Sequence, residues 1–308
     1  MSRIAYLYPG QGSQEVGMGK DFYESSPFAR EIFDRADEIL GYEISKLCLE
    51  GPEEDLKLTR NTQPALLVVS TIASGLIGKD PDIAAGHSLG EYSALVHAGA
   101  LSFDDAVRIV HNRGRYMQEA VPVGVGAMAA LLGADYDDVK HRLSAVEEGV
   151  VEIANWNSKE QIVIAGDKKA VEQAVSVIDP PRAVMLPVSA PFHCALMKSA
   201  EEKLSYDLDH VEFRDLKFPI ITNVEAEIIT RGDEARESLK KQVSRTVLWY
   251  ETMQVMNTER IDCFVELGAG NVLSGLIKRT SRNWETTPAV FSAGTMETVE
   301  KARRAIDV

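Results

Sequence analysis

The sequence has few cysteines and a shortage of basic side chains. Its three cysteines, at positions 48, 194 and 263, are odd in number and widely spaced. Neither a disulfide framework nor a metal site is therefore expected, and this usage fits a reducing compartment. Lysine and arginine number 33 against 47 aspartate and glutamate residues, which gives a formal net charge of −14. General binding to nucleic acid is not expected, because phosphate contacts need clustered basic side chains.

Long apolar runs are also missing. No window of the sequence approaches the length of a membrane span. The first residues, MSRIAYLYPGQG, carry too short an apolar run for a signal peptide. A hydrophobic content of 45% and a charged content of 26% are ordinary for a globular protein. We expect a cytoplasmic protein of one large domain or two of ordinary size, without a membrane segment.

The segment 84–96, AAGHSLGEYSALV, has the spacing of a nucleophile elbow around Ser88. Gly86 and Gly90 would allow a tight turn between an apolar strand and an amphipathic helix. The first N–H groups of that helix would suit a developing oxyanion. A plain Gly/Ser turn is the alternative reading of this pattern taken by itself.

Strand and helix patterns alternate along most of the chain. Strands are expected at 4–8, 83–85, 219–222, 263–267 and 289–293, and helices at 28–40, 64–77, 103–120, 194–208, 234–243, 271–280 and 296–306. Between 127 and 188 the order becomes βαββαβ, a split ferredoxin-like unit. The predicted fold is α/β: a hydrolase-like core with a mostly parallel sheet and helices on both faces, plus this inserted unit. Residues 1–124 and 190–308 would form the large catalytic subdomain, and 125–189 the small one.

A serine needs a base, and histidine is the usual one. Of the six histidines, His193 is the best candidate, because it stands where a strand ends and a helix begins. Ordinary α/β-hydrolases place their catalytic histidine late in the chain, whereas the last histidine here is His210. A lipase or thioesterase of that fold is therefore not expected.

Five motifs occur together in order: GQGSQ at 10–14, GHSLGEYSAL at 86–95, RGRYMQEAVP at 113–122, PVSAPFHCALM at 187–197 and FVELGAGNVLSGL at 264–276. With them the chain resembles the malonyl-CoA:acyl carrier protein transacylases from end to end. The combination is far more specific than the elbow alone.

The resemblance implies a Ser–His dyad. Ser88 would be the nucleophile that malonyl-CoA acylates, and His193 would be its base. The main-chain carbonyl of Gln242 would orient the imidazole, as an aspartate does in a triad. Backbone N–H groups of Gln11 and Leu89 would form the oxyanion hole.

The resemblance also implies how the acyl group is chosen. Arg113 would pair with the free carboxylate of malonate, because a guanidinium binds a carboxylate bidentately. Phe192 would crowd out an α-methyl branch, an effect of about 1–3 kcal/mol. His87, Asn157 and Gln161 would line the cleft.

Some positions depart from the family pattern. Lys159-Glu160 stands where the family has Pro-Gly, and Ala269 stands where it has proline. The connections at 78–81 and 179–181 look shorter than is typical. None of these positions belongs to the predicted dyad, so altered loops are expected rather than lost chemistry.

The implied partners are malonyl-CoA, as a substrate, and holo acyl carrier protein, which brings its own phosphopantetheine. Carrier proteins are acidic, so docking would need a local basic face. Lys278, Arg279 and Arg282 are the first candidates, with 168–169 and 182 as further ones, although such clusters are often only solvated helix ends. No cofactor, metal, nucleic acid or membrane is implied, and a monomer is expected.

The leading hypothesis is ping-pong malonyl transfer for fatty acid synthesis. A discrete acyltransferase of a polyketide assembly line is a close alternative, because these motifs barely separate the two. An editing thioesterase with the same dyad and a non-catalytic carrier-binding module are further alternatives. Arg113 and the early histidine argue against the first of these, and the intact dyad argues against the second.

Overall fold

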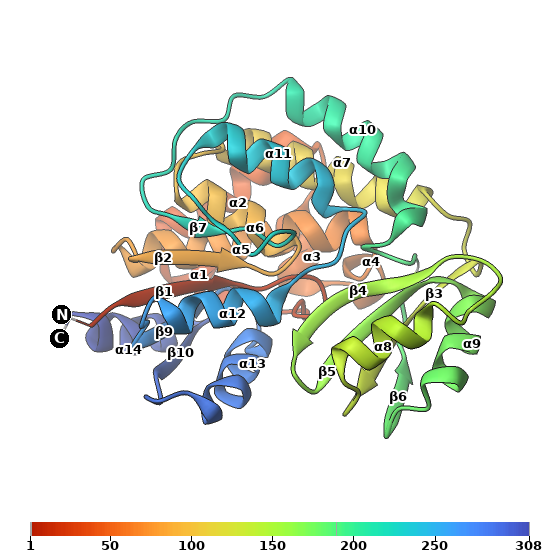
Figure 1. The fold of residues 1–308 in the computed structure, drawn as a ribbon. Helices are drawn as coiled ribbons and strands as arrows, with labels where there is room; N and C mark the ends of the chain where they lie inside the picture. Colours follow the sequence, from red (N-terminus) through yellow and green to blue (C-terminus); the bar gives the residue numbers. More distant parts are fainter. Residues whose placement is uncertain (1, 189, 308) are drawn as a thin grey trace.

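The computed structural model describes residues 2–188 and 190–307, and it contains two separate β-sheets (Figure 1). The larger sheet has the strand order β10-β9-β1-β2-β7-β8, and all neighbouring strands run parallel except β7 and β8. Its strands are β1 (Ile4–Tyr8), β2 (Ile83–Gly86), β7 (Ile220–Ile221), β8 (Ile228–Ile229), β9 (Cys263–Leu267) and β10 (Ala289–Ala293). The predicted α/β class with a mostly parallel sheet is confirmed.

Alternate residues of the central strand β1 point to opposite faces of this sheet. Tyr6 and Tyr8 join the apolar cluster on one face, while Ala5 and Leu7 join the cluster on the other. Helices therefore cover both faces (Figure 1), as parallel sheets require. The helices of the first side are α1 (Lys20–Ser25), α2 (Pro27–Leu40), α3 (Ile44–Glu50), α4 (Glu53–Leu56), α5 (Thr59–Ile77), α6 (Leu89–His97), α7 (Phe103–Glu119), α10 (Lys198–Asp209), α11 (Gly232–Gln242) and α14 (Met296–Ile306). Those of the second side are α12 (Trp249–Thr258) and α13 (Val272–Thr280), followed by a 3₁₀ turn at Ser281–Asn283.

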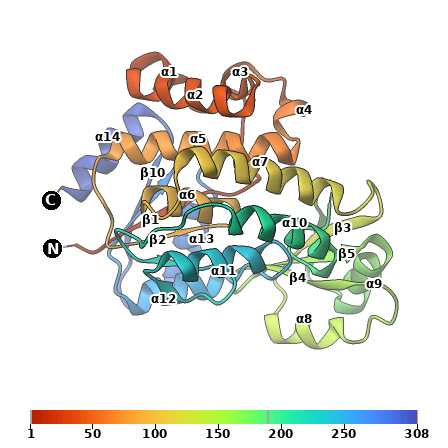
Figure 2. The same ribbon diagram turned by 90° about the horizontal axis from the view of Figure 1, so that it is seen from above.

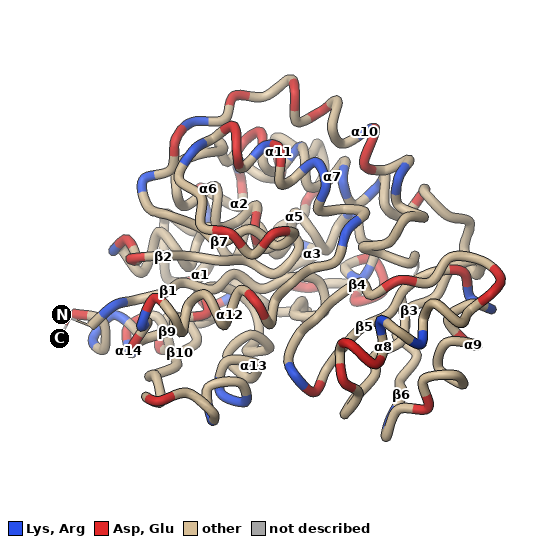
Figure 3. The backbone as a smooth tube through the Cα atoms, in the orientation of Figure 1, with Lys and Arg blue, Asp and Glu red and all other residues tan. Residues whose placement is uncertain are grey.

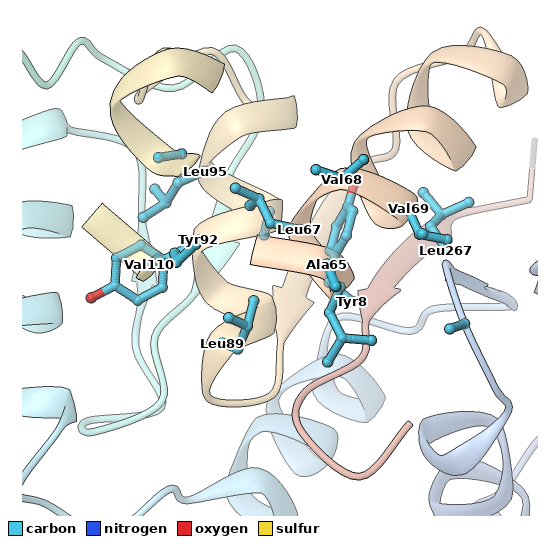
Figure 4. Close-up of a cluster of buried hydrophobic side chains, with 14 of the residues drawn as sticks. Tyr8, Ala65, Leu67, Val68, Val69, Leu89, Tyr92, Leu95, Val110 and Leu267 are labelled. Atoms are coloured by element: carbon cyan, nitrogen blue, oxygen red, sulfur yellow. The ribbon is translucent and has the colours of Figure 1, made fainter. Parts of the chain in front are cut away.

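Helix α5 is the central element of the first side. Its residues Leu67, Val68 and Val69 are fully buried, and Figure 4 shows them packed among side chains of the strands and of α6 and α7. Burying each side chain of this size contributes about 1.5–3 kcal/mol. This packing fixes the positions of the helices that carry the site.

The start of α5 corrects the predicted helix at 64–77. The helix begins at Thr59 and runs through Pro64. Proline has no N–H, so the carbonyl of Arg60 loses its helical donor. The ring Nδ1 of His111 lies 3.1 Å from that oxygen and replaces the lost hydrogen bond. A tertiary contact thus allows a proline that the sequence suggested as a helix start.

The smaller sheet is antiparallel, with the strand order β4-β5-β3-β6. Its elements are β3 (Gly126–Leu132), α8 (Tyr136–Leu143), β4 (Val151–Ser158), β5 (Gln161–Asp167), α9 (Lys168–Ile178) and β6 (Arg182–Met185). This is the predicted βαββαβ order, which is confirmed. We call residues 126–185 the small unit, and Figure 2 shows it at one end of the molecule. The predicted subdomain division remains a prediction, and its boundary residue 189, like the termini 1 and 308, lies outside the described residues.

Several short elements were not predicted. The largest is α12, whose buried residues Trp249, Met253 and Met256 follow a helical period. This helix begins after Leu248 without a side-chain cap, so the usual start signal is missing. The predicted helix at 194–208 is divided into a 3₁₀ turn at Ala195–Met197 and α10. A bilayer-spanning helix, which would need about 20 mostly apolar residues, is not found among the described residues.

Candidate active site

Ser88 lies on the turn that joins β2 to α6, at the carboxyl end of the large sheet. Its backbone has φ 51° and ψ −107°, a strained combination for a residue with a side chain. A Cβ on Gly90 would lie 2.0 Å from the carbonyl oxygen of Tyr8, and one on Gly86 would lie 1.9 Å from the carbonyl carbon of Gly90. Both flanking glycines are therefore required, and the predicted strand-to-helix elbow is confirmed.

The imidazole of His193 faces this serine. Ser88 Oγ lies 2.8 Å from His193 Nε2, and His193 Nδ1 lies 2.8 Å from the carbonyl oxygen of Gln242. A carbonyl only accepts hydrogen bonds, so the ring proton sits on Nδ1. The lone pair on Nε2 is then free to accept the serine proton.

The ring is held without a carboxylate. His193 has φ 61°, and its N–H donates to the carbonyl of Val243 at 3.2 Å. Burial and, to a smaller extent, the neighbouring charge of Arg113 lower the pKa of His193 to about 3. The imidazole is therefore neutral near pH 7, the state that a general base requires.

The predicted oxyanion-hole residues lie beside the serine. Leu89 begins α6, so its N–H has no partner within the helix. A Cβ on Gly10 would lie only 2.4 Å from the carbonyl oxygen of His87. The loop that carries Gln11 therefore lies close to the elbow. Within residues 2–188 and 190–307, no protein oxygen accepts from the N–H of Gln11 or Leu89. Both donors are available to a substrate oxygen.

Arg113 enters the site from α7. Only 1% of its surface is exposed, and its Nη2 donates to Ser88 Oγ at 3.1 Å and to Gln242 Oε1 at 3.0 Å. Its Nε has no hydrogen-bond partner, and no Asp or Glu in the described part of the chain lies within ion-pair distance. Burial lowers its pKa, but an arginine keeps its charge in proteins. The buried cation is thus available to an anionic group bound next to Ser88.

These groups surround a small cavity of about 120 Å³. Seven of the ten predicted site residues line it: Gln11, His87, Ser88, Leu89, Arg113, Phe192 and His193. Gln242 lies behind the dyad, in hydrogen-bond contact with both His193 and Arg113. The cavity is large enough for an acyl group, and among its described lining residues Arg113 carries the positive charge.

The small unit contributes to the site differently from what was predicted. Asn157 does not line the cavity, but its Oδ1 accepts a hydrogen bond from His87 Nε2 at 2.8 Å. Gln161 starts β5, pairs with Leu132 and Ser158, and stays outside the lining. Asn155 of β4 reaches the cavity instead. The predicted roles of Asn157 and Gln161 remain predictions.

Other lining residues were missed in the sequence. They are Gln63, Met117, Met128, Asn155, Leu186 and Val188. Met117 follows Arg113 by four positions on α7, and that helical spacing was the available signal. Gln63 comes from α5, and the others come from the small unit and the segment that follows it.

A serine with a neutral histidine, two free backbone N–H groups and a buried cation defines a serine acyltransferase or a related acyl-serine enzyme. The comparisons with known proteins decide between these. The chain matches the acyl transferase domain family over residues 5–305, and it belongs to that family.

Its relatives are of the same kind. The chain is 47% identical to the malonyl CoA-acyl carrier protein transacylase of Bacillus subtilis, covering 98% of this chain and 96% of that one. It is 45% identical to the enzyme of the same name from Escherichia coli K12, covering 91% and 93%. The crystal structure of acyl-carrier-protein-S-malonyltransferase from Bartonella henselae superposes with a TM-score of 0.95 at 41% identity, covering 99% and 100%. A type II PKS acyl-carrier protein in complex with its malonyl-transacylase gives a TM-score of 0.95 at 39% identity, covering 99% and 100%.

Proposed function

We propose that this chain moves a malonyl group from malonyl-CoA to the phosphopantetheine thiol of holo acyl carrier protein, for fatty acid synthesis. The observation that carries the proposal is the buried guanidinium of Arg113, 3.1 Å from the hydroxyl of Ser88. A neutral acyl group would leave this charge unpaired, whereas the carboxylate of a malonyl group would neutralise it. The names of the relatives agree with this choice.

The first half-reaction acylates the enzyme. Ser88 Oγ attacks the thioester carbonyl while its proton passes to Nε2 of His193. The carbonyl oxygen becomes an oxyanion, which the N–H groups of Gln11 and Leu89 stabilise. Collapse of this intermediate breaks the C–S bond, and the CoA sulfur takes the proton from Nε2. The carbonyl of Gln242 holds the imidazolium in place throughout.

The second half-reaction runs the same steps with the carrier. The phosphopantetheine thiol gives its proton to Nε2 of His193 and attacks the ester carbonyl of malonyl-Ser88. When the C–O bond breaks, Ser88 Oγ recovers the proton. Water competes as an acceptor, and the buried pair between Arg113 and the malonyl carboxylate keeps the acyl group inside a narrow cavity.

Phe192 is proposed as a second determinant of acyl choice. It lines the cavity next to the base and is 7% exposed. Its ring would meet an α-methyl branch, which costs about 1–3 kcal/mol. Discrimination against methylmalonyl is therefore expected to be modest compared with discrimination by charge.

The carrier is proposed to dock at the end of α13. Lys278, Arg279 and Arg282 are exposed there, and no ion pair to another described residue engages them (blue in Figure 3). Arg279 and Arg282 also line a groove of about 290 Å³ that includes Tyr250 and Trp284. Such a cationic face would attract an acidic carrier and raise its association rate.

We further propose that the enzyme acts as a monomer in the cytoplasm and needs neither cofactor nor metal. The second candidate function is malonyl loading in a polyketide assembly line. This second candidate is supported by the relative that was solved in complex with a type II PKS acyl-carrier protein. Transfer assayed with both kinds of carrier separates the two. An editing thioesterase is less favoured, because hydrolysis has no need of the Arg113 cation beside Ser88.

Intact-protein mass spectrometry after mixing with malonyl-CoA tests the proposal. A malonyl adduct is expected on the unaltered protein and on the control variant Ser93→Ala, which removes another buried hydroxyl of the same helix. The adduct should be absent in Ser88→Ala. Turnover of malonyl-CoA without a carrier would indicate a thioesterase, and no adduct at all would indicate a binding module.

A further inference from the structure

Glu91 is a buried carboxylate directly behind the active site. It lies on α6, three positions after Ser88, and none of its surface is exposed. No Lys or Arg in the described part of the chain lies within ion-pair distance of it. Its Oε2 accepts from Gln242 Nε2 at 2.7 Å and from the N–H of Asn223 at 3.1 Å. A buried charge of this kind is costly, so its place next to the dyad calls for an explanation.

The contact with Gln242 fixes the direction of an amide. Gln242 Nε2 donates to Glu91 and, at 2.9 Å, to the carbonyl of Ser88. Its Oε1 is then left to accept from Nη2 of Arg113 at 3.0 Å. An ionised carboxylate only accepts hydrogen bonds, so it forbids the flipped amide, which would turn an NH₂ group toward the guanidinium. The hydrogen bonds therefore run in one direction, from Arg113 to Gln242 and from Gln242 to Glu91.

The contact with Asn223 reaches the elbow itself. The side chain of Asn223 accepts from the N–H of Ser88 at 2.6 Å and donates to the carbonyl of Gly86 at 2.7 Å. These bonds hold the strained backbone on both sides of His87. Glu91 therefore contacts both groups that support the Arg113–Ser88 pair.

We propose that Glu91 is a positioning residue for acyl-group selection: through the amide of Gln242 it orients and counterbalances the guanidinium of Arg113 that faces Ser88. This inference rests on the proposed malonyl transfer, and it names the group that holds the guanidinium of Arg113 in position. The role depends on the charge of Glu91, because a neutral side chain neither fixes the amide nor balances the cation.

The protonation of Glu91 gives the proposal a second readout. Burial raises the pKa of Glu91 to about 7. The hydrogen bonds from Gln242 and Asn223 and the charge of Arg113 oppose the rise, and the charge of Glu225 adds to it. Arg113 of α7 and Glu225 of the loop after β7 are the charged groups that face it, and Ser238 of α11 adds a hydroxyl at 3.5 Å. Glu91 is charged above neutrality and loses its charge as the pH falls, so selection for malonyl should weaken below about pH 7.

The test compares Ser88 acylation by malonyl-CoA and by acetyl-CoA in Glu91→Gln, in single-turnover kinetics at pH 8. We expect acylation by malonyl-CoA to fall about tenfold or more, the size of one charge-assisted interaction, and acylation by acetyl-CoA to change by less than about threefold. The matched control is Glu266→Gln, which removes another fully buried carboxylate, one that caps α13 through Leu273 and Ser274. The control should leave the malonyl-to-acetyl ratio unchanged.

Equal losses with both substrates, or the same ratio change in Glu266→Gln, would overturn the proposal in favour of a merely structural role. Should Glu91→Gln not fold, the unaltered protein supplies the test. Its malonyl-to-acetyl ratio must fall between pH 8 and pH 5.5, and a constant ratio refutes the proposal. If the unaltered protein shows no preference for malonyl at pH 8, the proposed function fails instead, and the two failures stay distinguishable.

Discussion

Replacing Arg113 by methionine should abolish the preference for a malonyl group without removing the nucleophile. Methionine keeps an unbranched side chain that can fill most of the space of the arginine stem. It removes the charge and the hydrogen bonds of Nη2 to Ser88 and Gln242. The distances that define the dyad, between Ser88 and His193, do not involve this side chain.

The size of the effect follows from the burial of the cation. Arg113 is 1% exposed, so a malonyl carboxylate left without it would be an unpaired charge in a buried site. Losing one partner of such a pair costs about 3–5 kcal/mol, which is roughly a 10²- to 10⁴-fold loss in kcat/KM for malonyl-CoA. An acetyl group carries no charge, so its kcat/KM should stay constant or rise up to about tenfold.

The assay is acylation of Ser88 followed by rapid quench and intact mass, with each acyl-CoA in turn. A circular dichroism melt of the variant provides the folding control. An equal loss of activity toward both substrates in Arg113→Met, or a fall in malonyl transfer of less than about threefold, would show that Arg113 does not pair with the malonyl carboxylate.

Three further outcomes are expected. Because burial lowers the pKa of His193 to about 3, the base stays neutral as the pH falls; acylation by acetyl-CoA should hold from pH 8 to pH 5, and a loss centred near pH 6.5 would show an ordinary histidine. Gly90→Ala places a Cβ 2.0 Å from the carbonyl of Tyr8; thermal unfolding should reveal a loss of more than about 3 kcal/mol, typical of severe overpacking, and a melt like that of the parent would show that the elbow relaxes. Charge reversal at Lys278 and Arg279 should raise KM for the carrier roughly tenfold and leave acylation by malonyl-CoA unchanged; equal KM values would remove the docking site.

The parts of the fold that were predicted correctly rest on local patterns. Mostly apolar runs of five residues marked β1, β9 and β10 with their observed bounds. The glycines around Ser88 marked the elbow, because no other residue fits between strand and helix there. In each case a short stretch of sequence was enough to predict the conformation.

The parts that were not predicted depend on distant contacts. Helix α5 passes through Pro64, and the carbonyl of Arg60 that proline leaves without a donor is within hydrogen-bond distance of His111, 51 positions away. In the sequence, Glu91 is one charged residue on a predicted helix. Its contacts with Asn223 and Gln242, which are 132 and 151 positions away, make it part of the site. Local periodicity carries no information about such partners.

The fate of isolated malonyl-Ser88 tests the central claim most directly. The acylated protein is freed of malonyl-CoA and divided between buffer and holo acyl carrier protein, and malonate and malonyl-carrier are measured over time. We expect a stable adduct in buffer and rapid appearance of malonyl-carrier when the carrier is added. Release of free malonate at one rate, with or without carrier, would contradict it.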